Sequence, residues 1–456
     1  MTRIKSTNPY TNEVLAEFQP HTQEELEAKL SAGSIAFSSW KETSFSKRAE
    51  LMGNAARVLK DNREKYAKII SLEMGKVLKE SLAEVDKCAL ACKYYADNAA
   101  SFLKEEPIEL PDGARAKVIH QPLGIVLAVM PWNFPFWQVF RFAAPTLMAG
   151  NVGVLKHASN VPQCSLAIEE VFTEAGFPEG AFQSLLIDSS TTTKLIEDAR
   201  IKAVTLTGSE KAGASVASTA GKHIKKSLLE LGGSDPFIVL KDANIKKAAE
   251  TAVKARMINF GQSCIAAKRF IVEEDVYEEF LAHFVEHFSQ LKKGDPMSEE
   301  SDFACMARPD LAKELYTQLD NSIKAGAKLI YGGEAPEENS AVFQPAILTD
   351  IPTSAPAYSE ELFGPVATIF KVKNEDDAIA LANDSEFGLG ASIWSEDKDK
   401  AEQLAAKIES GAVFINAMVA SNPHLPFGGI KKSGYGRELS RYGILEFVNS
   451  KTVYLG

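Results

Sequence analysis

The chain has 456 residues, more than one hydrophobic core usually supports, so we expect two or more domains. Acidic residues (61) outnumber basic ones (50), and a net charge of −11 without a basic block argues against nucleic acid or an anionic membrane as a partner. A hydrophobic fraction of 45% is typical of a globular enzyme, and no apolar run resembles a signal peptide or a membrane span. We therefore expect a cytoplasmic protein.

The pattern in the first part of the chain predicts helices whose apolar faces pack against the rest of the protein. Apolar residues recur at helical spacing over 24–37, 46–59 and 78–103. The pattern then changes to two short β-rich segments within 114–130, separated by Gln121-Pro122-Leu123-Gly124. These segments indicate either a hairpin or a change of strand.

Strand-like and helical segments then alternate in two series, which is typical of parallel sheets covered by helices. The first series predicts strands at 152–155, 184–187, 203–206, 228–231 and 237–240. The second predicts helices at 245–260, 276–291 and 311–325, and strands at 270–272, 328–330, 367–370, 391–393 and 412–415. The simplest architecture is two α/β domains with a boundary near the turn-prone stretch 232–236.

Five scattered cysteines suit a reducing compartment. Cys88 and Cys92 lie four residues apart on a predicted helix, where a disulfide is conceivable but two packing thiols are the simpler interpretation. Cys264 differs because it follows Gly261-Gln262-Ser263, where little bulk shields the thiol. A thiolate is a nucleophile only where access is open and its pKa is lowered, and an inert core cysteine is the alternative.

Two further residues supply what a nucleophilic cysteine needs. Asn133 lies between two prolines in Pro131-Trp132-Asn133-Phe134-Pro135, and its amide is suited to an oxyanion; a turn asparagine among packing aromatics is the alternative. Glu230 is flanked by leucines before Gly232-Gly233. Burial raises a carboxylate pKa towards that of a general base, although a structural salt bridge would explain it too.

Other positions are candidates for a nucleotide cofactor. Lys156 ends a predicted strand, where open α/β sheets bind ligands, although a solvated lysine is the competing account. Gly208 and Ser209 join a strand to a helix N-terminus that favours anions. Glu361 and Phe363 offer a carboxylate for a ribose and a ring for a flat cofactor.

Taken together and in this order, these motifs resemble the aldehyde dehydrogenase superfamily over nearly the whole chain, through to Pro426-Phe427-Gly428-Gly429 and Gly436-Arg437-Glu438. Leu155-Lys156-His157-Ala158 is most similar to bacterial succinate-semialdehyde dehydrogenases. The resemblance implies an α/β fold with two Rossmann-like domains and a small β oligomerisation element. The implied division is 1–113 with 131–231 for the cofactor, 232–425 for catalysis, and 114–130 with 436–456 for oligomerisation strands.

The resemblance also implies residue roles. Cys264 attacks the aldehyde to give a thiohemiacetal, Asn133 and the Cys264 N–H hold the oxyanion, hydride passes to a nicotinamide, and Glu230 activates water that hydrolyses the thioester. The implied cofactor contacts are Trp132, Lys156, Ser159, Gly208, Ser209, Glu361 and Phe363. A CoA-acylating relative would use the same cysteine but omit the base, so Glu230 speaks against it. A homodimer or homotetramer is expected.

The implied substrate is succinate semialdehyde, or else another small or acidic aldehyde. Arg141 matches one of the two arginines that bind the substrate carboxylate in such relatives, whereas Ile258 occupies the place of the second and Arg256 lies two residues earlier. This leaves the carboxylate clamp incomplete. Ser421, with His424, is a candidate for the missing polar contacts, and an ordinary surface loop is the alternative.

Cofactor choice depends on Ser159. NAD-specific members place a glutamate there, which would repel a 2′-phosphate, so the neutral serine predicts NADP as the preferred cofactor with NAD also usable.

The stretch His283-Phe284-Val285-Glu286-His287 fits a zinc-peptidase pattern, but phenylalanines form the apolar stripe of the same predicted helix. We therefore expect no metal site.

Overall fold

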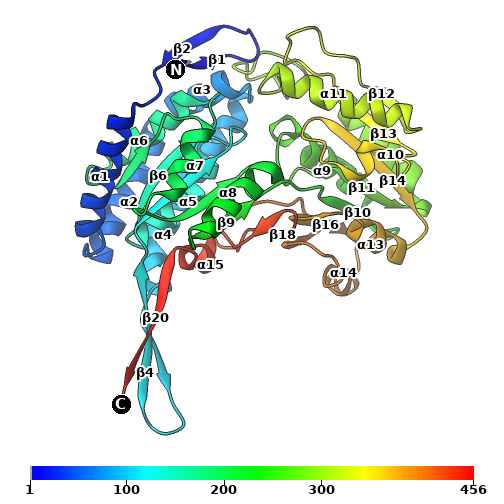
Figure 1. The fold of residues 1–456 in the computed structure, drawn as a ribbon. Coiled ribbons are helices and arrows are strands. Elements are labelled where there is room, and N and C mark those ends of the chain that lie inside the picture. Colours follow the sequence, from blue (N-terminus) through cyan, green and yellow to red (C-terminus); the bar gives the residue numbers. More distant parts are fainter. Residues whose placement is uncertain (1–2) are drawn as a thin grey trace.

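The computed structural model describes residues 3–456, and two separate β-sheets form its two halves (Figure 1). The first sheet has the strand order β19-β9-β8-β5-β6-β7, with only β19 antiparallel to its neighbour. Its strands are β5 (Ile125–Met130), β6 (Val152–His157), β7 (Phe182–Ser184), β8 (Ile201–Thr207), β9 (Lys226–Glu230) and β19 (Gly434–Tyr435). The central strand β5 is continuously apolar and almost wholly buried, as expected for a parallel strand covered on both faces.

The second sheet has the order β12-β13-β14-β11-β10-β16-β17 and is parallel except for the edge strand β12. Its strands are β10 (Pro236–Val239), β11 (Arg269–Glu273), β12 (Lys328–Gly332), β13 (Ala346–Thr349), β14 (Val366–Val372), β16 (Gly390–Trp394) and β17 (Ala412–Ile415). The chain passes from the first sheet to the second between β9 and β10, so the two sheets approach each other at residues 231–235.

Helices cover both faces of each sheet. On the first sheet, one face packs on α1 (Gln23–Trp40), α7 (Ser189–Glu197) and α8 (Glu210–Lys222), and the other on α2 (Phe45–Asp61), α3 (Arg63–Met74), α4 (Leu78–Phe102), α5 (Trp137–Met148), α6 (Pro162–Glu174) and α15 (Ser440–Leu445). On the second, α9 (Ile245–Met257), α10 (Glu274–Ser289) and α11 (Pro309–Lys324) cover one face, α13 (Glu375–Asn383) and α14 (Lys398–Ala405) cover the other, and a short α12 (Pro356–Ser359) precedes β14. Within residues 3–456, no helix is both long and apolar enough to cross a membrane.

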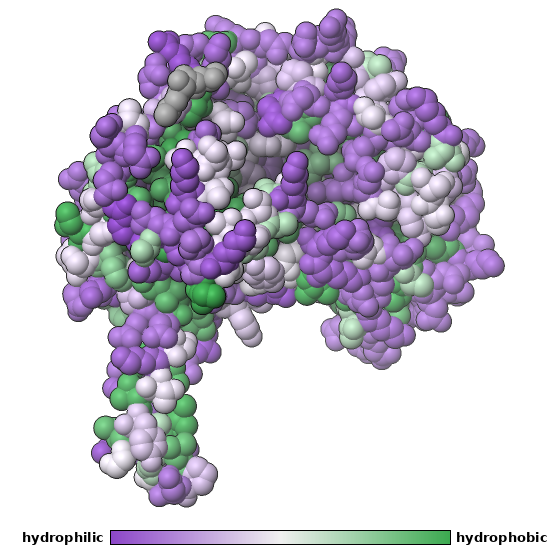
Figure 2. All heavy atoms as spheres, viewed as in Figure 1, coloured by the Kyte–Doolittle hydropathy of each residue, from purple (hydrophilic) through white to green (hydrophobic). Residues whose placement is uncertain are grey.

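A three-stranded antiparallel sheet projects from the body as an arm (Figures 1 and 2). It consists of β3 (Glu106–Glu109), β4 (Arg115–Pro122) and β20 (Val448–Leu455), and β20 carries the C-terminal end of the chain. Ile108, Tyr454 and Leu455 are exposed on it. Two small sheets complete the fold, β1 (Ile4–Thr7) with β2 (Val14–Phe18) and β15 (Phe387–Gly388) with β18 (Ile430–Lys431).

The structure confirms two α/β halves and differs from the sequence expectations in detail. The segment 114–130 is a change of strand, because β4 lies in the arm whereas β5 is a central strand of the first sheet. Gly124, at φ 138°, lies at the break between them, and residue 130 therefore does not bound the arm. The arm also includes β3, which the predicted division placed with the cofactor-binding residues, and β13 had no predicted counterpart.

Candidate active site

Cys264 lies on a tightly folded loop that follows α9. The helix ends at Met257, and a 3₁₀ turn over Ile258–Gly261 holds Asn259 and Phe260 at φ 52° and 55°, in the left-handed region that non-glycine residues seldom adopt. The Asn259 amide donates to the carbonyl oxygens of Asn133 (2.7 Å) and Gln262 (3.0 Å), which stabilises this conformation. The loop is thereby fixed against the segment that carries Asn133.

A buried lysine holds the other side of this loop. Lys268 Nζ donates to the carbonyl oxygens of Ser263 (3.0 Å), Cys264 (2.9 Å) and Ala266 (3.1 Å), and it lies 3.2 Å from Glu361 Oε1. Three carbonyl oxygens of the loop thus share one buried ammonium. The Cys264 N–H finds no acceptor within residues 3–456, so it is free to bind a ligand oxygen.

The thiol of Cys264 is partly buried, and burial raises its pKa to about 12. The positive charges of Arg141 and Lys268 oppose that rise, whereas Glu230 reinforces it. At neutral pH the thiol is therefore protonated before a ligand binds, and it must lose a proton to act as a nucleophile.

Glu230 ends β9 opposite Thr207 of β8, at the carboxyl edge of the first sheet. Its side chain is buried, and neither carboxylate oxygen has a hydrogen-bond partner among the described residues. Burial, followed by the charge of Glu438, raises the pKa of Glu230 to about 8. A Cβ on Gly428 would lie 2.8 Å from Glu230 Oε1, so the glycine leaves room for this carboxylate. An unpartnered carboxyl group with a pKa near neutrality is suited to proton transfer.

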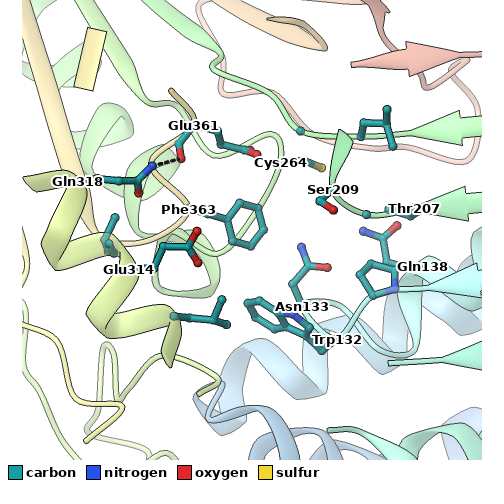
Figure 3. Close-up of a pocket in the computed structure, with 16 residues that line it drawn as sticks. Trp132, Asn133, Gln138, Thr207, Ser209, Cys264, Glu314, Gln318, Glu361 and Phe363 are labelled. Atoms are coloured by element: carbon teal, nitrogen blue, oxygen red, sulfur yellow. Dashed lines mark hydrogen bonds between the residues drawn. The ribbon is translucent and has the colours of Figure 1, made fainter. Parts of the chain in front are cut away.

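A cavity of about 300 Å³ lies between the two halves of the molecule, at the carboxyl ends of the strands (Figure 3). Among the predicted site residues, its lining includes Trp132, Asn133, Gly208, Ser209, Cys264, Glu361 and Phe363. The structure thus brings together seven side chains and glycines that are spread over more than half of the sequence.

The cavity is equipped for a nucleotide. Ser209 is the N-cap of α8, where free N–H groups favour a phosphate. Glu361 is fixed by the Gly233 N–H (3.0 Å) and by Lys268, and Gln318 donates to its backbone oxygen (Figure 3). The Trp132 and Phe363 rings meet edge to face, 5.8 Å apart, and leave an aromatic surface in the cavity.

Lys156 and Ser159 lie outside this lining. Lys156 is near the carboxyl end of β6, and burial lowers its pKa while Asp188 opposes that effect. Ser159 lines a different cavity of about 430 Å³ together with Arg308. Both residues lie at or just after the carboxyl end of β6, and β6 belongs to the same sheet as β8, the strand that precedes Ser209.

The predicted substrate residues Arg141 and Ser421 are not part of the cavity lining. Arg141 is buried in an ion pair with Glu438, and its guanidinium stacks 4.6 Å from the Phe427 ring centre. Ser421 Oγ accepts from Lys87 Nζ (2.7 Å) and from Trp137 Nε1 (3.0 Å). Arg256 is completely buried and donates to the Gly261 carbonyl (2.8 Å), which makes it a support of the cysteine loop.

Sequence reasoning missed Lys268, Lys87 and the pairing of Glu438. Lys268 follows Cys264 by four residues, after Ile265-Ala266-Ala267, and this apolar setting is only a weak signal for a lysine that binds the loop. Lys87 resembles any exposed lysine of an amphipathic helix, and nothing in the sequence places it beside Ser421. Glu438 belongs to the Gly436-Arg437-Glu438 motif, which indicates no role for the carboxylate. Within residues 3–456, no cluster of three or more His, Cys, Asp or Glu side chains is placed to hold a metal.

Comparisons with known proteins show which family the chain resembles. The model of the Aldehyde dehydrogenase family matches residues 1–453. The chain is 53% identical to a probable succinate-semialdehyde dehydrogenase [NADP(+)] of Synechocystis, over 99% of both chains. It is 47% identical to a succinate-semialdehyde dehydrogenase [NADP(+)] of Mycobacterium avium, over 99% of this chain and 97% of that one. The crystal structure of succinic semialdehyde dehydrogenase from Streptococcus pyogenes, in complex with NADP+, superposes with a TM-score of 0.97 at 41% identity over 99% of both chains.

Proposed function

The chain belongs to the aldehyde dehydrogenase family, and from this premise we propose that it oxidises succinate semialdehyde to succinate, with NADP preferred and NAD also usable. The fold predicted from the sequence, two Rossmann-like α/β domains and a small β element, is that of the family. The relatives named for succinate semialdehyde and NADP support the proposed substrate and cofactor.

One observation carries the proposed chemistry: the thiol of Cys264, whose own backbone N–H is free, lines the cavity, and the unpartnered buried carboxyl group of Glu230, outside that lining, is near enough for its charge to raise the pKa of the thiol. In the proposed mechanism, the Cys264 sulfur adds to the aldehyde carbon and its proton is lost to a base. The Cys264 N–H and the Asn133 amide donate to the oxyanion that forms. For this, Asn133 Nδ2, which donates to the Gln262 carbonyl at 3.1 Å, must turn one N–H to the substrate.

When bound, the nicotinamide cofactor supplies the hydride acceptor that converts the thiohemiacetal to a thioester. Glu230 then takes a proton from water, the resulting hydroxide attacks the thioester carbon, and the Cys264 thiolate leaves as the carboxylic acid forms. Burial of Glu230 keeps its proton affinity high enough for this step near neutral pH.

The residues present fit a dinucleotide. The capped start of α8 at Ser209 suits the pyrophosphate, and the Glu361 carboxylate is already fixed to receive a ribose hydroxyl. Trp132 and Phe363 provide apolar surface beside Cys264 for the nicotinamide. Lys156 would hold the adenosine ribose, and the neutral Ser159 leaves a 2′-phosphate unopposed.

We also propose that the protein is a homodimer or homotetramer that works in the cytoplasm. Exposed Ile108, Tyr454 and Leu455 on the arm, together with the open edges of β3 and β20, would be a liability in a monomer. The five cysteines are free thiols, which suits a reducing compartment. Light scattering on the purified protein tests the assembly, and cell fractionation tests the location.

The direct test is a panel of aldehydes with NAD and NADP, following reduced cofactor, on wild type and Cys264→Ala. We expect turnover with succinate semialdehyde and NADP in the wild type alone. No reduction with any aldehyde would refute the proposed activity. Activity with simple alkanals but not with succinate semialdehyde would refute only the substrate.

A further inference from the structure

Lys87 is a cation without an anion. It lies on α4 with its Nζ hydrogen-bonded to Ser421 Oγ and 4.3 Å from the centre of the Trp137 ring. Among the described residues it forms no ion pair, whereas the neighbouring Arg141 is paired with Glu438. The hydroxyl and the aromatic face are its only direct partners, and the charge of Glu84, which is itself paired with Lys76, acts on it without a hydrogen bond, so the ammonium has no ion-pair partner of its own.

Hydrogen-bond donors remain unused at the same place. A lysine ammonium has three donors, and Lys87 uses one of them within the described residues. The Ser421 oxygen accepts from both Lys87 and Trp137, so its own hydroxyl hydrogen points elsewhere, and it donates to no acceptor among the described residues. Ser421 is also buried. The corner formed by Lys87, Trp137 and Ser421 therefore offers a positive charge and free donors, which is what a carboxylate needs.

This corner belongs to the surroundings of Cys264. The charge of Arg141 lowers the pKa of the Lys87 ammonium and of the Cys264 thiol alike, so Arg141 has both groups as neighbours. Trp137 and Arg141 are four residues apart on α5 and share a face of that helix, while Gln138, next to Trp137, lines the cavity with Cys264. Lys87 thus lies close to the site of chemistry but outside the lining that suits the cofactor.

We propose that Lys87 and Ser421 bind the distal carboxylate of the aldehyde substrate, with Lys87 supplying the second cation that Ile258 cannot provide. The inference rests on the proposed function and names the residues that select an aldehyde carrying an acid group. Arg141 is left to balance Glu438 and to set the charge around Cys264. Burial lowers the pKa of Lys87 to about 8, so a bound carboxylate would stabilise its charged form.

The test compares succinate semialdehyde with butanal, an uncharged aldehyde with the same number of carbons, in wild type, Lys87→Met, Lys87→Arg and Ser421→Ala. Lys93→Met is the matched control, because Lys93 is an exposed lysine of the same helix paired with Asp97. For Lys87→Met we expect kcat/KM for succinate semialdehyde to fall on the order of 10- to 100-fold, mainly through KM, with butanal changed far less. Lys87→Arg should keep more of the preference than Lys87→Met, and Ser421→Ala should lose a smaller part of it.

The outcomes separate this inference from the proposed function. Equal losses for both aldehydes in Lys87→Met, or no loss for either, would overturn the role of Lys87. If the wild type prefers butanal, the proposed substrate fails and this role fails with it. If the wild type prefers succinate semialdehyde and Lys87→Met keeps that preference, only the role of Lys87 fails. Thermal melting checks folding, and Lys87→Met should melt close to wild type, because the loss of the contacts to Ser421 and Trp137 is offset by removal of a partly buried charge that has no ion-pair partner.

Discussion

Lys268 Nζ lies 3.2 Å from Glu361 Oε1, so one buried ammonium connects the loop of the nucleophile to the carboxylate proposed to hold the cofactor. Nucleophile and cofactor are thereby positioned by the same group. A substitution of Lys268 should therefore affect both the position of the Cys264 loop and the binding of the cofactor at Glu361.

We predict that Lys268→Met raises KM for NADP and lowers kcat together, because Glu361 and three loop carbonyls lose their partner. The free energy of unfolding should fall by about 3 kcal/mol, the cost of breaking a buried pair. Steady-state kinetics and chemical denaturation measure the two effects. Lys371→Met, which removes the exposed pair with Glu278, is the control. An unchanged KM for NADP would contradict the link to Glu361.

Asn133→Ala should lower kcat by roughly 10²- to 10³-fold, the usual cost of removing one donor to an oxyanion. The KM for the cofactor should change little, because Asn133 faces Cys264 and the Gln262 carbonyl rather than the capped start of α8. Stopped-flow measurement of the first turnover checks whether the loss precedes hydride transfer. A full-rate first turnover in the variant would refute an oxyanion role.

Glu230→Gln should separate the two halves of the reaction. If Glu230 activates the water, the variant forms about one reduced cofactor per site in a burst and then turns over slowly, because its thioester is not hydrolysed. Coenzyme A should not restore turnover if the enzyme is a hydrolytic dehydrogenase. A variant without a burst would place Glu230 before hydride transfer instead.

The pKa of Glu230 also predicts two pH effects. Because the base acts when deprotonated and its pKa is about 8, kcat should rise with pH through that value in wild type. The folded-state pKa lies above the usual 4.5, so the folded protein retains a proton that the unfolded chain loses. The stability that this proton contributes is complete below about pH 4.5 and is lost as the pH rises to about 8. Denaturation of Glu230→Gln should show a weaker decline over the same range.

Ser159→Glu should reverse the cofactor preference, since a carboxylate beside the adenosine 2′ position would repel the phosphate of NADP and accept from the hydroxyl of NAD. We expect kcat/KM for NADP to fall by at least 10-fold with NAD unchanged or improved. Ser159→Ala is the matched control and should leave the ratio near that of wild type. Equal changes with both cofactors would show that Ser159 lies away from the 2′ position.

Periodicity alone predicted the two parallel sheets because their strands are short apolar runs separated by amphipathic helices, and β5 is the clearest example. It could not separate β4 from β5, because two adjacent β-rich segments resemble a hairpin until their partners are known. Strand pairing between residues more than 300 positions apart, such as β4 with β20, has no local signature.

For the site, Cys264, Asn133 and Glu230 could be proposed from motifs because each has an unusual local setting. The residues that contact them, or whose charges shift their pKa values, could not be proposed from motifs. The sequence offers Arg141 as a substrate contact, a prediction that still stands, but it does not show the ion pair with Glu438, because only tertiary structure brings that carboxylate to Arg141. The roles of Lys87 and Lys268 likewise depend on their tertiary contacts, with Ser421 and with the Cys264 carbonyl. The local sequence around a lysine on a helix or after a turn does not indicate such a contact.

The late position of Glu438 has a consequence for synthesis. Cys264 and Glu230 leave the ribosome well before the segment that buries Glu230, which spans Phe427 to Glu438 and includes β19, the antiparallel partner of β9. Until that segment arrives, a nascent chain carries the thiol loop but lacks the enclosure that gives the carboxyl group its raised proton affinity. Catalytic competence is therefore delayed until residues 427–438 have been synthesised and have packed against β9 and Glu230.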